Sequence, residues 1–322
     1  MNRIAIIFPG QGVQKPEIGK WLYDNFPSAK LLFEEVNDAL DTKLTDIMFC
    51  EERFDQLKLT QNAQPAIMAV GSAVMQVLST DFGLNADKFA CCVAGHSLGE
   101  YTALVATNMF SVRDGAKLLH RRGMAMQNAV PLGIGGMTAI LGIDDVSVIE
   151  EIAKAATGNA GICEIANDNC PGQCVLSGHK KAVDLAGALA KEKGAKAAIP
   201  LDVSVPSHCS LMSSVCSIIK DYLSEVEKKS ASLPIIQNYT AKEETDPGTI
   251  ANNLAAQITG RVRWRESMLS LAEKGVRKII EVGPGSILKG LAKRTIPEVE
   301  VLSINSTSDL ESAANIVSEG RG

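Results

Sequence analysis

The chain is 322 residues long, with 46% hydrophobic and 21% charged residues, values close to those of average soluble globular proteins. A net charge of −5 and a pI of about 5.5 give no indication of the basic face that a nucleic-acid-binding protein needs. No apolar run reaches the roughly 18 residues of a membrane helix, and the run at 4–8 is too short for a signal-peptide core. We therefore expect a cytoplasmic protein, bound neither to nucleic acid nor to a membrane, with one large domain or two closely joined ones.

Eight cysteines occur along the chain, and in a sequence of this length without a signal peptide they are expected to be reduced thiols. They are Cys50, Cys91, Cys92, Cys163, Cys170, Cys174, Cys209 and Cys216. Cys170 and Cys174 lack a second Cys or His pair at ligand spacing, so we predict no metal site.

Short β-rich runs alternate with amphipathic helical stretches, a pattern typical of an α/β protein. In chain order, the first predicted elements are a strand at 3–8, a buried helix at 64–80, a buried strand at 89–94 and helices at 98–108 and 111–128. Ser111 is the expected N-cap of the last of these helices.

The strongest local motif lies between the strand at 89–94 and the helix that follows it. Gly95-His96-Ser97-Leu98-Gly99 fits G-x-S-x-G, and a strand-to-helix turn is the context that a nucleophile elbow requires. The two glycines relieve crowding at a sharp turn, so the serine hydroxyl stands exposed. The helix beginning at Leu98 directs backbone N–H groups and its positive dipole end towards developing negative charge. The alternative interpretation is a glycine-rich turn with an incidental serine.

Residues 130–203 have an order of elements of their own. After a linker at 131–136, the pattern predicts a strand at 137–142, a helix at 145–157, strands at 162–167 and 173–177 separated by a loop at 167–172, a helix at 179–193 and a strand at 196–201. This βαββαβ order is the ferredoxin-like arrangement. We therefore expect a small domain at 130–203, inserted into a larger domain made of 1–129 and 204–322.

The remainder of the chain continues the α/β pattern. Helices are predicted near 211–227, 247–257, 265–274 and 285–294, and strands near 234–238, 277–282 and 299–304. The last 15 residues or so are weakly specified, and we assign no element to them.

A nucleophilic serine needs a base, and the chain contains four histidines. His96 adjoins the serine, but adjacent side chains at such a turn usually diverge. His120 lies in the middle of a helix and His179 opens one, so both are expected at the surface. His208 follows a strand-like run in a loop far along the chain, where a triad base can lie, and is the favoured candidate. The acid stays open, because no spacing singles out Asp202.

Two further glycine turns follow predicted strands, at 10–12 and 283–285. Such turns can form an oxyanion hole or a phosphate cradle, although neither matches a dinucleotide fingerprint or a P-loop.

Two adjacent arginines, Arg121 and Arg122, lie late in an otherwise apolar helix. Adjacent helical positions point about 100° apart, so one arginine is expected to face solvent and the other the interior. A buried arginine requires a carboxylate or phosphate partner. A structural salt bridge is the alternative to a ligand-binding role.

Seven motifs together resemble those of malonyl-CoA:acyl-carrier-protein transacylases and the related acyltransferase domains of polyketide synthases. They are Phe8-Pro9-Gly10-Gln11-Gly12, Gln61-x-x-x-Gln64-Pro65-Ala66, Gly95-His96-Ser97-Leu98-Gly99-Glu100-Tyr101, Arg122-Gly123-x-x-Met126-Gln127, Asn169-x-Pro171-Gly172-Gln173, Val205-Pro206-Ser207-His208 and Glu281-Val282-Gly283-Pro284-Gly285. They occur in the family order and extend over almost the whole chain. The resemblance implies an α/β-hydrolase-like large domain with a parallel sheet, plus the inserted ferredoxin-like domain.

The resemblance also implies roles for the residues that would perform the chemistry. Ser97 resembles the acylated nucleophile and His208 its general base. The family orients this histidine through a backbone carbonyl rather than an aspartate, and Gln257 matches that position. The backbone N–H groups of Gln11 and Leu98 resemble the oxyanion hole.

Substrate recognition follows from the same resemblance. Arg122 is implied to bind the free carboxylate of the malonyl group, with His96 and Asn169 as further substrate-binding residues. The implied reaction is ping-pong: Ser97 takes malonyl from malonyl-CoA, and the phosphopantetheine thiol of acyl carrier protein then takes it for fatty acid synthesis. We expect no cofactor and no metal, and the lack of a heptad seam favours a monomer.

Carrier proteins are acidic in general, and this chain is acidic overall as well. Local basic residues are therefore expected to dock the partner. The candidates are Arg261, Arg263, Arg265, Lys289, Lys293 and Arg294. The alternative interpretation is an ordinary solvated face.

Three alternative functions stay open from the sequence. A discrete acyltransferase of a polyketide pathway would share these motifs, and Ser207 before the histidine also occurs in methylmalonyl-using relatives. A serine thioesterase or esterase would use the same elbow, but Arg122 argues against it. A malonyl-CoA-binding sensor would not require an intact Ser97 and His208.

Overall fold

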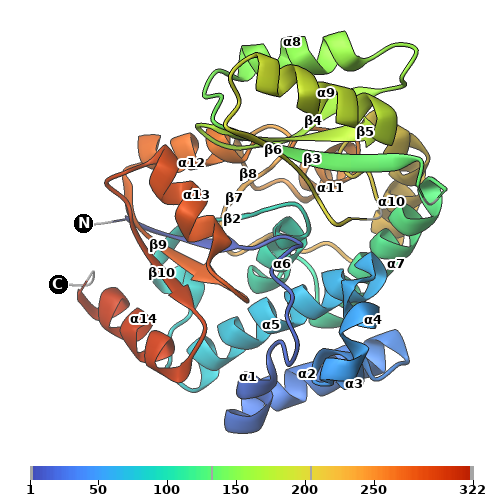
Figure 1. Ribbon diagram of the computed structural model, residues 1–322. Helices are drawn as coiled ribbons and strands as arrows, with labels where there is room; N and C mark the ends of the chain where they lie inside the picture. The colour runs from blue at the N-terminus through green and yellow to red at the C-terminus, as the bar shows by residue number, and fades with distance from the viewer. Residues whose placement is uncertain (1–2, 132, 204, 320–322) are drawn as a thin grey trace.

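The structure, a computed structural model, describes residues 3–131, 133–203 and 205–319 and contains two sheets (Figure 1). The larger sheet has the strand order β10 (Glu300–Ile304), β9 (Val276–Val282), β1 (Arg3–Phe8), β2 (Ala90–Gly95), β7 (Ile235–Ile236) and β8 (Glu243–Glu244). All neighbouring strands pair in parallel except β7 and β8. The large unit therefore has the parallel sheet expected from the sequence.

Helices cover both faces of this sheet, so its central strands are apolar on both sides. Ile4, Ile6 and Phe8 of β1 pack towards one face, whereas Ala5 and Ile7 pack towards the other. The first face shares one hydrophobic core with α1 (Lys20–Asn25), α2 (Pro27–Leu40), α3 (Leu44–Met48), α4 (Phe54–Lys58), α5 (Thr60–Thr80), α6 (Leu98–Ala106), α7 (Val112–Ala129), α10 (Ser213–Glu225), α11 (Pro247–Gln257) and α14 (Thr307–Glu319). The second face is covered by α12 (Trp264–Glu273) and α13 (Ile287–Thr295).

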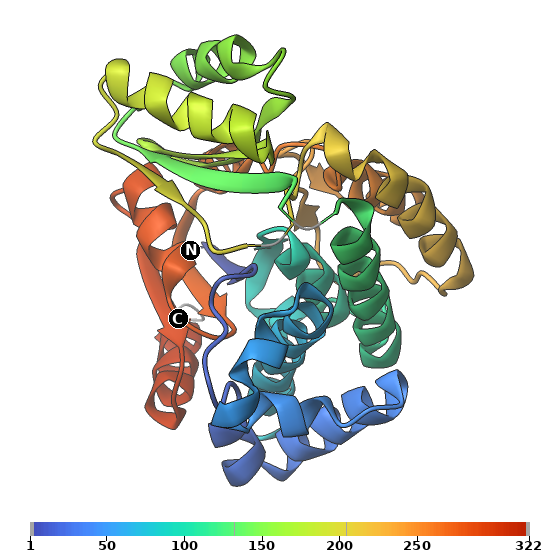
Figure 2. The same cartoon turned by 45° about the vertical axis from the view of Figure 1, so that its right-hand side comes forward.

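The smaller sheet is antiparallel and has the strand order β4-β5-β3-β6. Its elements follow the chain as β3 (Gly135–Leu141), α8 (Val146–Ala156), β4 (Cys163–Cys170), β5 (Gln173–His179), α9 (Lys180–Glu192) and β6 (Ala197–Pro200). Helices α8 and α9 cover its outer face, and the inner face looks towards the large unit (Figure 2). This confirms the predicted βαββαβ order, while the domain boundaries at 130 and 203 stay a prediction.

The main differences from the predicted elements lie in the helices and in strand β4. Helices α1 to α4 occupy residues 20–58, for which no element was predicted, and α14 occupies the end of the chain. Helix α5 begins at Thr60 rather than at 64. Strand β4 runs on to Cys170, because two irregularities in its register accommodate polar residues where a loop was expected. No helix in the described part of the chain is long and apolar enough to cross a membrane.

The early start of α5 places Pro65 inside the helix, where proline cannot donate to the carbonyl of Gln61. His120 of α7 supplies the missing donor, because its Nδ1 lies 3.0 Å from the Gln61 oxygen. Gly123 allows this close crossing, since a Cβ at that position would lie 2.4 Å from the Cα of Gln61. The α5–α7 crossing therefore has a fixed geometry, and Arg122 lies beside it.

Candidate active site

Ser97 lies at the turn between β2 and α6, in the strand–turn–helix context predicted for it. Its backbone has φ 54° and ψ −109°, a strained conformation for a residue other than glycine. A Cβ on Gly95 would lie 2.0 Å from the carbonyl carbon of Gly99, and one on Gly99 would lie 2.2 Å from the Phe8 oxygen. Both glycines of the motif are therefore required by close backbone approach.

Asn238, which follows β7, holds this turn from the neighbouring strand. Its Oδ1 accepts a hydrogen bond from the N–H of Ser97 at 2.6 Å, and its Nδ2 donates to the Gly95 oxygen at 2.6 Å. The sequence analysis missed this residue. The available signal was a polar side chain at the carboxyl end of a parallel strand, where sites of α/β proteins gather.

His208 lies against the serine, as the sequence analysis favoured. Its Nε2 is 2.7 Å from the Oγ of Ser97, and its Nδ1 is 2.8 Å from the backbone oxygen of Gln257. Because a carbonyl oxygen can only accept, the imidazole carries its proton on Nδ1, and Nε2 accepts from the serine hydroxyl. No carboxylate within the described ranges contacts His208, and Asp202 lies elsewhere on the cavity wall. A backbone carbonyl therefore occupies the place of the missing acid.

His208 is almost fully buried. Burial, together with the nearby charge of Arg122, lowers the pKa of His208 from 6.5 to about 3. The imidazole is therefore neutral at physiological pH and available as a base.

We expect nitrogen-15 NMR of labelled histidine to show His208 neutral, with its proton on Nδ1, at pH 5. An unperturbed histidine is mostly protonated there, and free histidine in the same buffer supplies the control. The unfolded chain binds this proton near pH 6.5 and the folded chain does not, so this group removes stability as pH falls from 6.5 towards 3. A titration midpoint near pH 6.5 for His208 would contradict the expected shift.

Arg122 is the buried member of the arginine pair, with 1% of its surface exposed, whereas Arg121 forms an exposed ion pair with Glu225. The guanidinium donates from Nη1 to Gln64 Oε1 at 2.6 Å, and from Nη2 to Ser97 Oγ and Gln257 Oε1, both at 3.1 Å. All three acceptors are neutral. A buried cation therefore lies in hydrogen-bond contact with the candidate nucleophile and has no carboxylate within 4.0 Å among the described residues.

Glu100 is a second buried charge near the site that the sequence analysis did not assign. Its carboxylate accepts from Gln237 Nε2 at 3.0 Å, the Asn238 N–H at 3.0 Å and Gln257 Nε2 at 2.8 Å. Burial raises the pKa of Glu100 to about 7, and these donors and the charge of Arg122 oppose that rise. Because the Gln257 side chain bonds both charged groups, it fixes the distance between Glu100 and Arg122.

A cavity of about 570 Å³ opens in front of these groups, between the large unit and the inner face of the small sheet. Gln11 and Leu98 line it, and neither backbone N–H donates a hydrogen bond to another residue that the structure describes. Both predicted oxyanion-hole residues therefore border the same cavity as Ser97. The small unit contributes apolar side chains, among them Met137, Ala139 and Val175, and three amides, Asn167, Asn169 and Gln173.

His96 and Asn169 also line the cavity, and they contact each other across the two units. The Nε2 of His96 lies 2.9 Å from Asn169 Oδ1, so this nitrogen carries the proton and donates. Asn169 belongs to β4 rather than to a loop, which corrects the sequence analysis. Burial lowers the pKa of His96, so this ring is a neutral donor.

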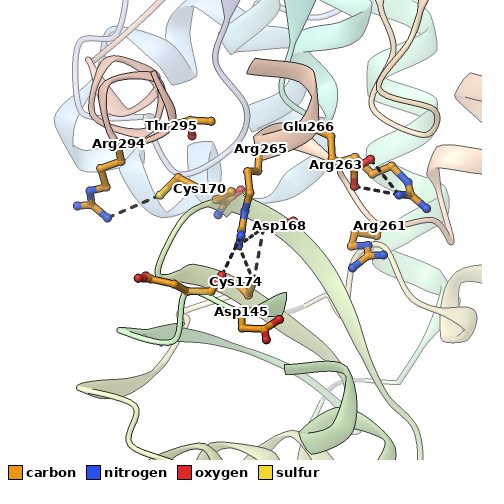
Figure 3. Close-up of polar contacts among 12 residues, drawn as sticks. Asp145, Asp168, Cys170, Cys174, Arg261, Arg263, Arg265, Glu266, Arg294 and Thr295 are labelled. Carbon is orange, nitrogen blue, oxygen red and sulfur yellow. Dashed lines mark hydrogen bonds and ion pairs between the residues drawn. The ribbon is translucent and has the colours of Figure 1, made fainter. Parts of the chain in front are cut away.

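Strand β4 is fastened to the large unit by buried polar contacts (Figure 3). Arg265 Nη2 lies 2.7 Å from Asp168 Oδ1, and its Nη1 donates to the Asp144 oxygen at 2.9 Å. The Asp168 N–H donates to the Val262 oxygen at 3.0 Å. These contacts hold the strand that carries Asn169.

The predicted basic docking residues divide into two groups. Arg261, Arg263 and Arg265 pair with Glu150, Glu266 and Asp168 of the chain itself, and Arg265 is largely buried, so it is not a solvated docking cation as predicted. The ammonium groups of Lys289 and Lys293 of α13 have no carboxylate within 4.0 Å in the described parts of the chain. Arg294 donates to Gln173 and contacts the thiol of Cys170. No group of His, Cys, Asp and Glu side chains suited to a metal ion occurs among the described residues.

The chain matches the acyl transferase domain family over residues 5–317. It is 40% identical to the malonyl CoA-acyl carrier protein transacylase of Bacillus subtilis, over 99% of this chain and 98% of that protein. It superposes on the acyl-carrier-protein-S-malonyltransferase of Bartonella henselae with a TM-score of 0.94 and 45% identity, covering 98% of this chain and 99% of the other.

A third similar structure is a malonyl-transacylase in complex with a type II PKS acyl-carrier protein. Its TM-score is 0.93 at 35% identity, covering 98% of this chain and all of that one. These similarities extend over nearly the full length of each protein and confirm the resemblance drawn from the seven motifs. The chain is an enzyme of the acyl transferase domain family and belongs with the malonyl CoA-acyl carrier protein transacylases.

Proposed function

We propose that this enzyme transfers a malonyl group from malonyl-CoA to the phosphopantetheine thiol of acyl carrier protein, supplying fatty acid synthesis. The carrying observation is the buried guanidinium of Arg122, 3.1 Å from the Oγ of Ser97 and without a carboxylate of its own. A buried cation beside a nucleophile suits an acyl group that ends in a free carboxylate, because a planar guanidinium binds a carboxylate through two hydrogen bonds. The similar proteins, which this chain matches over nearly their full length, are named as malonyl transferases acting on acyl carrier protein, and this supports the same reaction.

In the first half-reaction, Ser97 Oγ attacks the thioester carbon while its proton moves to Nε2 of His208. The N–H groups of Gln11 and Leu98 donate hydrogen bonds to the thioester oxygen and stabilise the negative charge that forms on it. The tetrahedral intermediate then expels coenzyme A, whose sulfur takes the proton from His208. A malonyl-serine ester remains, with its carboxylate on Arg122.

The second half-reaction uses the same groups in reverse. His208 takes the proton of the phosphopantetheine thiol, and the sulfur attacks the ester carbon. The intermediate expels the Oγ of Ser97, which recovers its proton from His208. No step requires a metal ion or a cofactor, and every group involved comes from one chain, which supports a monomer. We also propose a cytoplasmic location, with which the free thiols of the eight cysteines are compatible.

The test is intact-protein mass spectrometry after brief exposure to equal amounts of malonyl-, methylmalonyl- and acetyl-CoA. We expect a single malonyl adduct, located by peptide fragmentation at Ser97 and lost when carrier protein with its phosphopantetheine is added. Free malonate accumulating without an adduct would identify a hydrolase instead. A methylmalonyl adduct as the main product would overturn the proposed substrate.

A further inference from the structure

A chain of side-chain hydrogen bonds runs from Arg122 to the loop that follows β1. Arg122 Nη1 donates to Gln64 Oε1 at 2.6 Å, and Gln64 Nε2 donates to Thr60 Oγ1 at 2.8 Å. Thr60 Oγ1 in turn lies 2.9 Å from Gln11 Oε1. Gln11 is also the residue whose backbone N–H borders the cavity beside Ser97. The chain therefore joins the buried cation to one side of the candidate oxyanion hole.

The direction of each bond in this chain follows from the guanidinium at its end. Arginine can only donate, so the amide oxygen of Gln64 must face it and the amide nitrogen must face Thr60. The hydroxyl of Thr60 accepts that bond, which leaves its own proton for Gln11 Oε1. The three bonds thus have one consistent arrangement, and the Oγ1 of Thr60 is the one atom in it that both accepts and donates.

Thr60 is held firmly enough to orient its neighbours. It is the first residue of α5 and only 4% of its surface is exposed. The crossing of α5 and α7 fixes this part of the helix, because Gly123 and His120 both contact Gln61. Gln11, in contrast, lies on an exposed loop. The Thr60 hydroxyl is the one side-chain group among the described residues that bonds the Gln11 side chain.

We infer that Thr60 is a positioning residue that orients both the carboxylate-binding Arg122 and the oxyanion-binding loop at Gln11. This inference rests on the proposed malonyl transfer. The Thr60 hydroxyl accepts from the amide nitrogen of Gln64 and so keeps the amide oxygen of Gln64 directed at the Arg122 guanidinium. Only an acyl group with a free carboxylate depends on the orientation of that guanidinium. The same hydroxyl bonds the Gln11 side chain and so restrains the Gln11 backbone N–H, which donates to the thioester oxygen. Every acyl group depends on this N–H.

The experiment compares Thr60→Val and Thr60→Ser with the wild type in self-acylation by malonyl-CoA and by acetyl-CoA. Valine keeps the shape of threonine but can neither accept from Gln64 nor donate to Gln11. We expect its kcat/KM with malonyl-CoA to fall at least about tenfold, the size of effect produced by losing buried hydrogen bonds, one of them linked to a charged group. The ratio of malonyl to acetyl kcat/KM should fall about threefold or more, whereas Thr60→Ser should stay within about twofold of the wild type.

Two further variants separate positioning from a general loss of packing. Thr107→Val removes a buried hydroxyl that bonds only to carbonyl oxygens in the last turn of α6, so neither the rate nor the ratio should change. Gln11→Met keeps the backbone N–H, removes the acceptor for Thr60 and lies on the surface, so folding is not at risk. We expect it to slow both substrates by a similar factor and to leave their ratio unchanged.

Each outcome decides between the inference and its alternatives. A wild-type rate and ratio in Thr60→Val, or equal impairment of the valine and serine variants, would overturn the role of the hydroxyl. An unchanged ratio of malonyl to acetyl kcat/KM in Thr60→Val would show that Thr60 does not act on Arg122. Wild-type activity of Gln11→Met would show that Thr60 does not act through the Gln11 loop, and this test holds even if Thr60→Val fails to fold. A wild-type enzyme that forms no malonyl adduct would instead overturn the proposed function, and this inference with it.

Discussion

Replacing Ser97 with alanine is expected to lower the rate of malonyl transfer by a factor of about 10⁴ or more, the scale of loss when a nucleophilic serine is removed. The Oγ of Ser97 is the atom that Nε2 of His208 and Nη2 of Arg122 both contact, at 2.7 and 3.1 Å. Among the described residues, Ser97 has the one hydroxyl that is hydrogen-bonded to both of these nitrogens. The measurement is single-turnover transfer from radiolabelled malonyl-CoA to carrier protein, with the malonyl-enzyme adduct followed in parallel.

A matched control is Ser72→Ala, which removes a buried hydroxyl that contacts only the sulfur of Met68 within α5. It should keep full transfer activity. The Ser97→Ala enzyme should still bind malonyl-CoA, because Arg122 remains and retains Gln64 as an acceptor. Transfer above about one per cent of the wild-type rate would rule out the ester mechanism.

Replacing Arg122 with methionine should change the selectivity of the enzyme. The malonyl carboxylate would lose its buried counter-charge, and breaking a buried ion pair from one side costs about 3–5 kcal/mol. We therefore expect kcat/KM for malonyl-CoA to fall by roughly 10²- to 10⁴-fold, while acetyl-CoA, which has no carboxylate there, changes far less. Methionine also leaves Glu100 without the nearby cation, so thermal unfolding must be recorded for the variant.

Arg121→Met is the matched control, because the neighbouring arginine lies on the same helix but forms an exposed ion pair with Glu225. Exposed pairs contribute about 1 kcal/mol or less, so activity and selectivity should both be retained. Equal losses for malonyl- and acetyl-CoA in Arg122→Met would mean that the arginine supports the fold rather than the substrate.

Much of the site was predictable because local rules place it. The spacing of Gly95 and Gly99 around Ser97 needs only the sterics of a tight turn, and those sterics hold in the structure. The 100° between adjacent helical positions predicted that one of Arg121 and Arg122 would be buried, and the family resemblance indicated Arg122. The alternation of β and α segments likewise predicted both sheets.

Contacts between distant segments were beyond such rules. Asn238 bonds the turn at Ser97 from a strand 141 positions away, and Thr60 bonds a loop 49 positions away. The partner of His208 is a backbone oxygen, which every residue possesses, so no search for acidic side chains would have found it. The register irregularities of β4 depend on pairing with β5, and this is why Asn169 was placed in a loop.

The positive φ of Ser97 and His208, 54° and 60°, has a consequence for anyone who redesigns this protein. Procedures that choose residues by local backbone preference favour glycine or asparagine at such positions, because most other side chains are strained there. Applied without constraint, they would raise stability by discarding the two residues that form the 2.7 Å contact of the site. A thermostable variant of this enzyme therefore has to be sought in its helices and surface loops, with both positions held fixed.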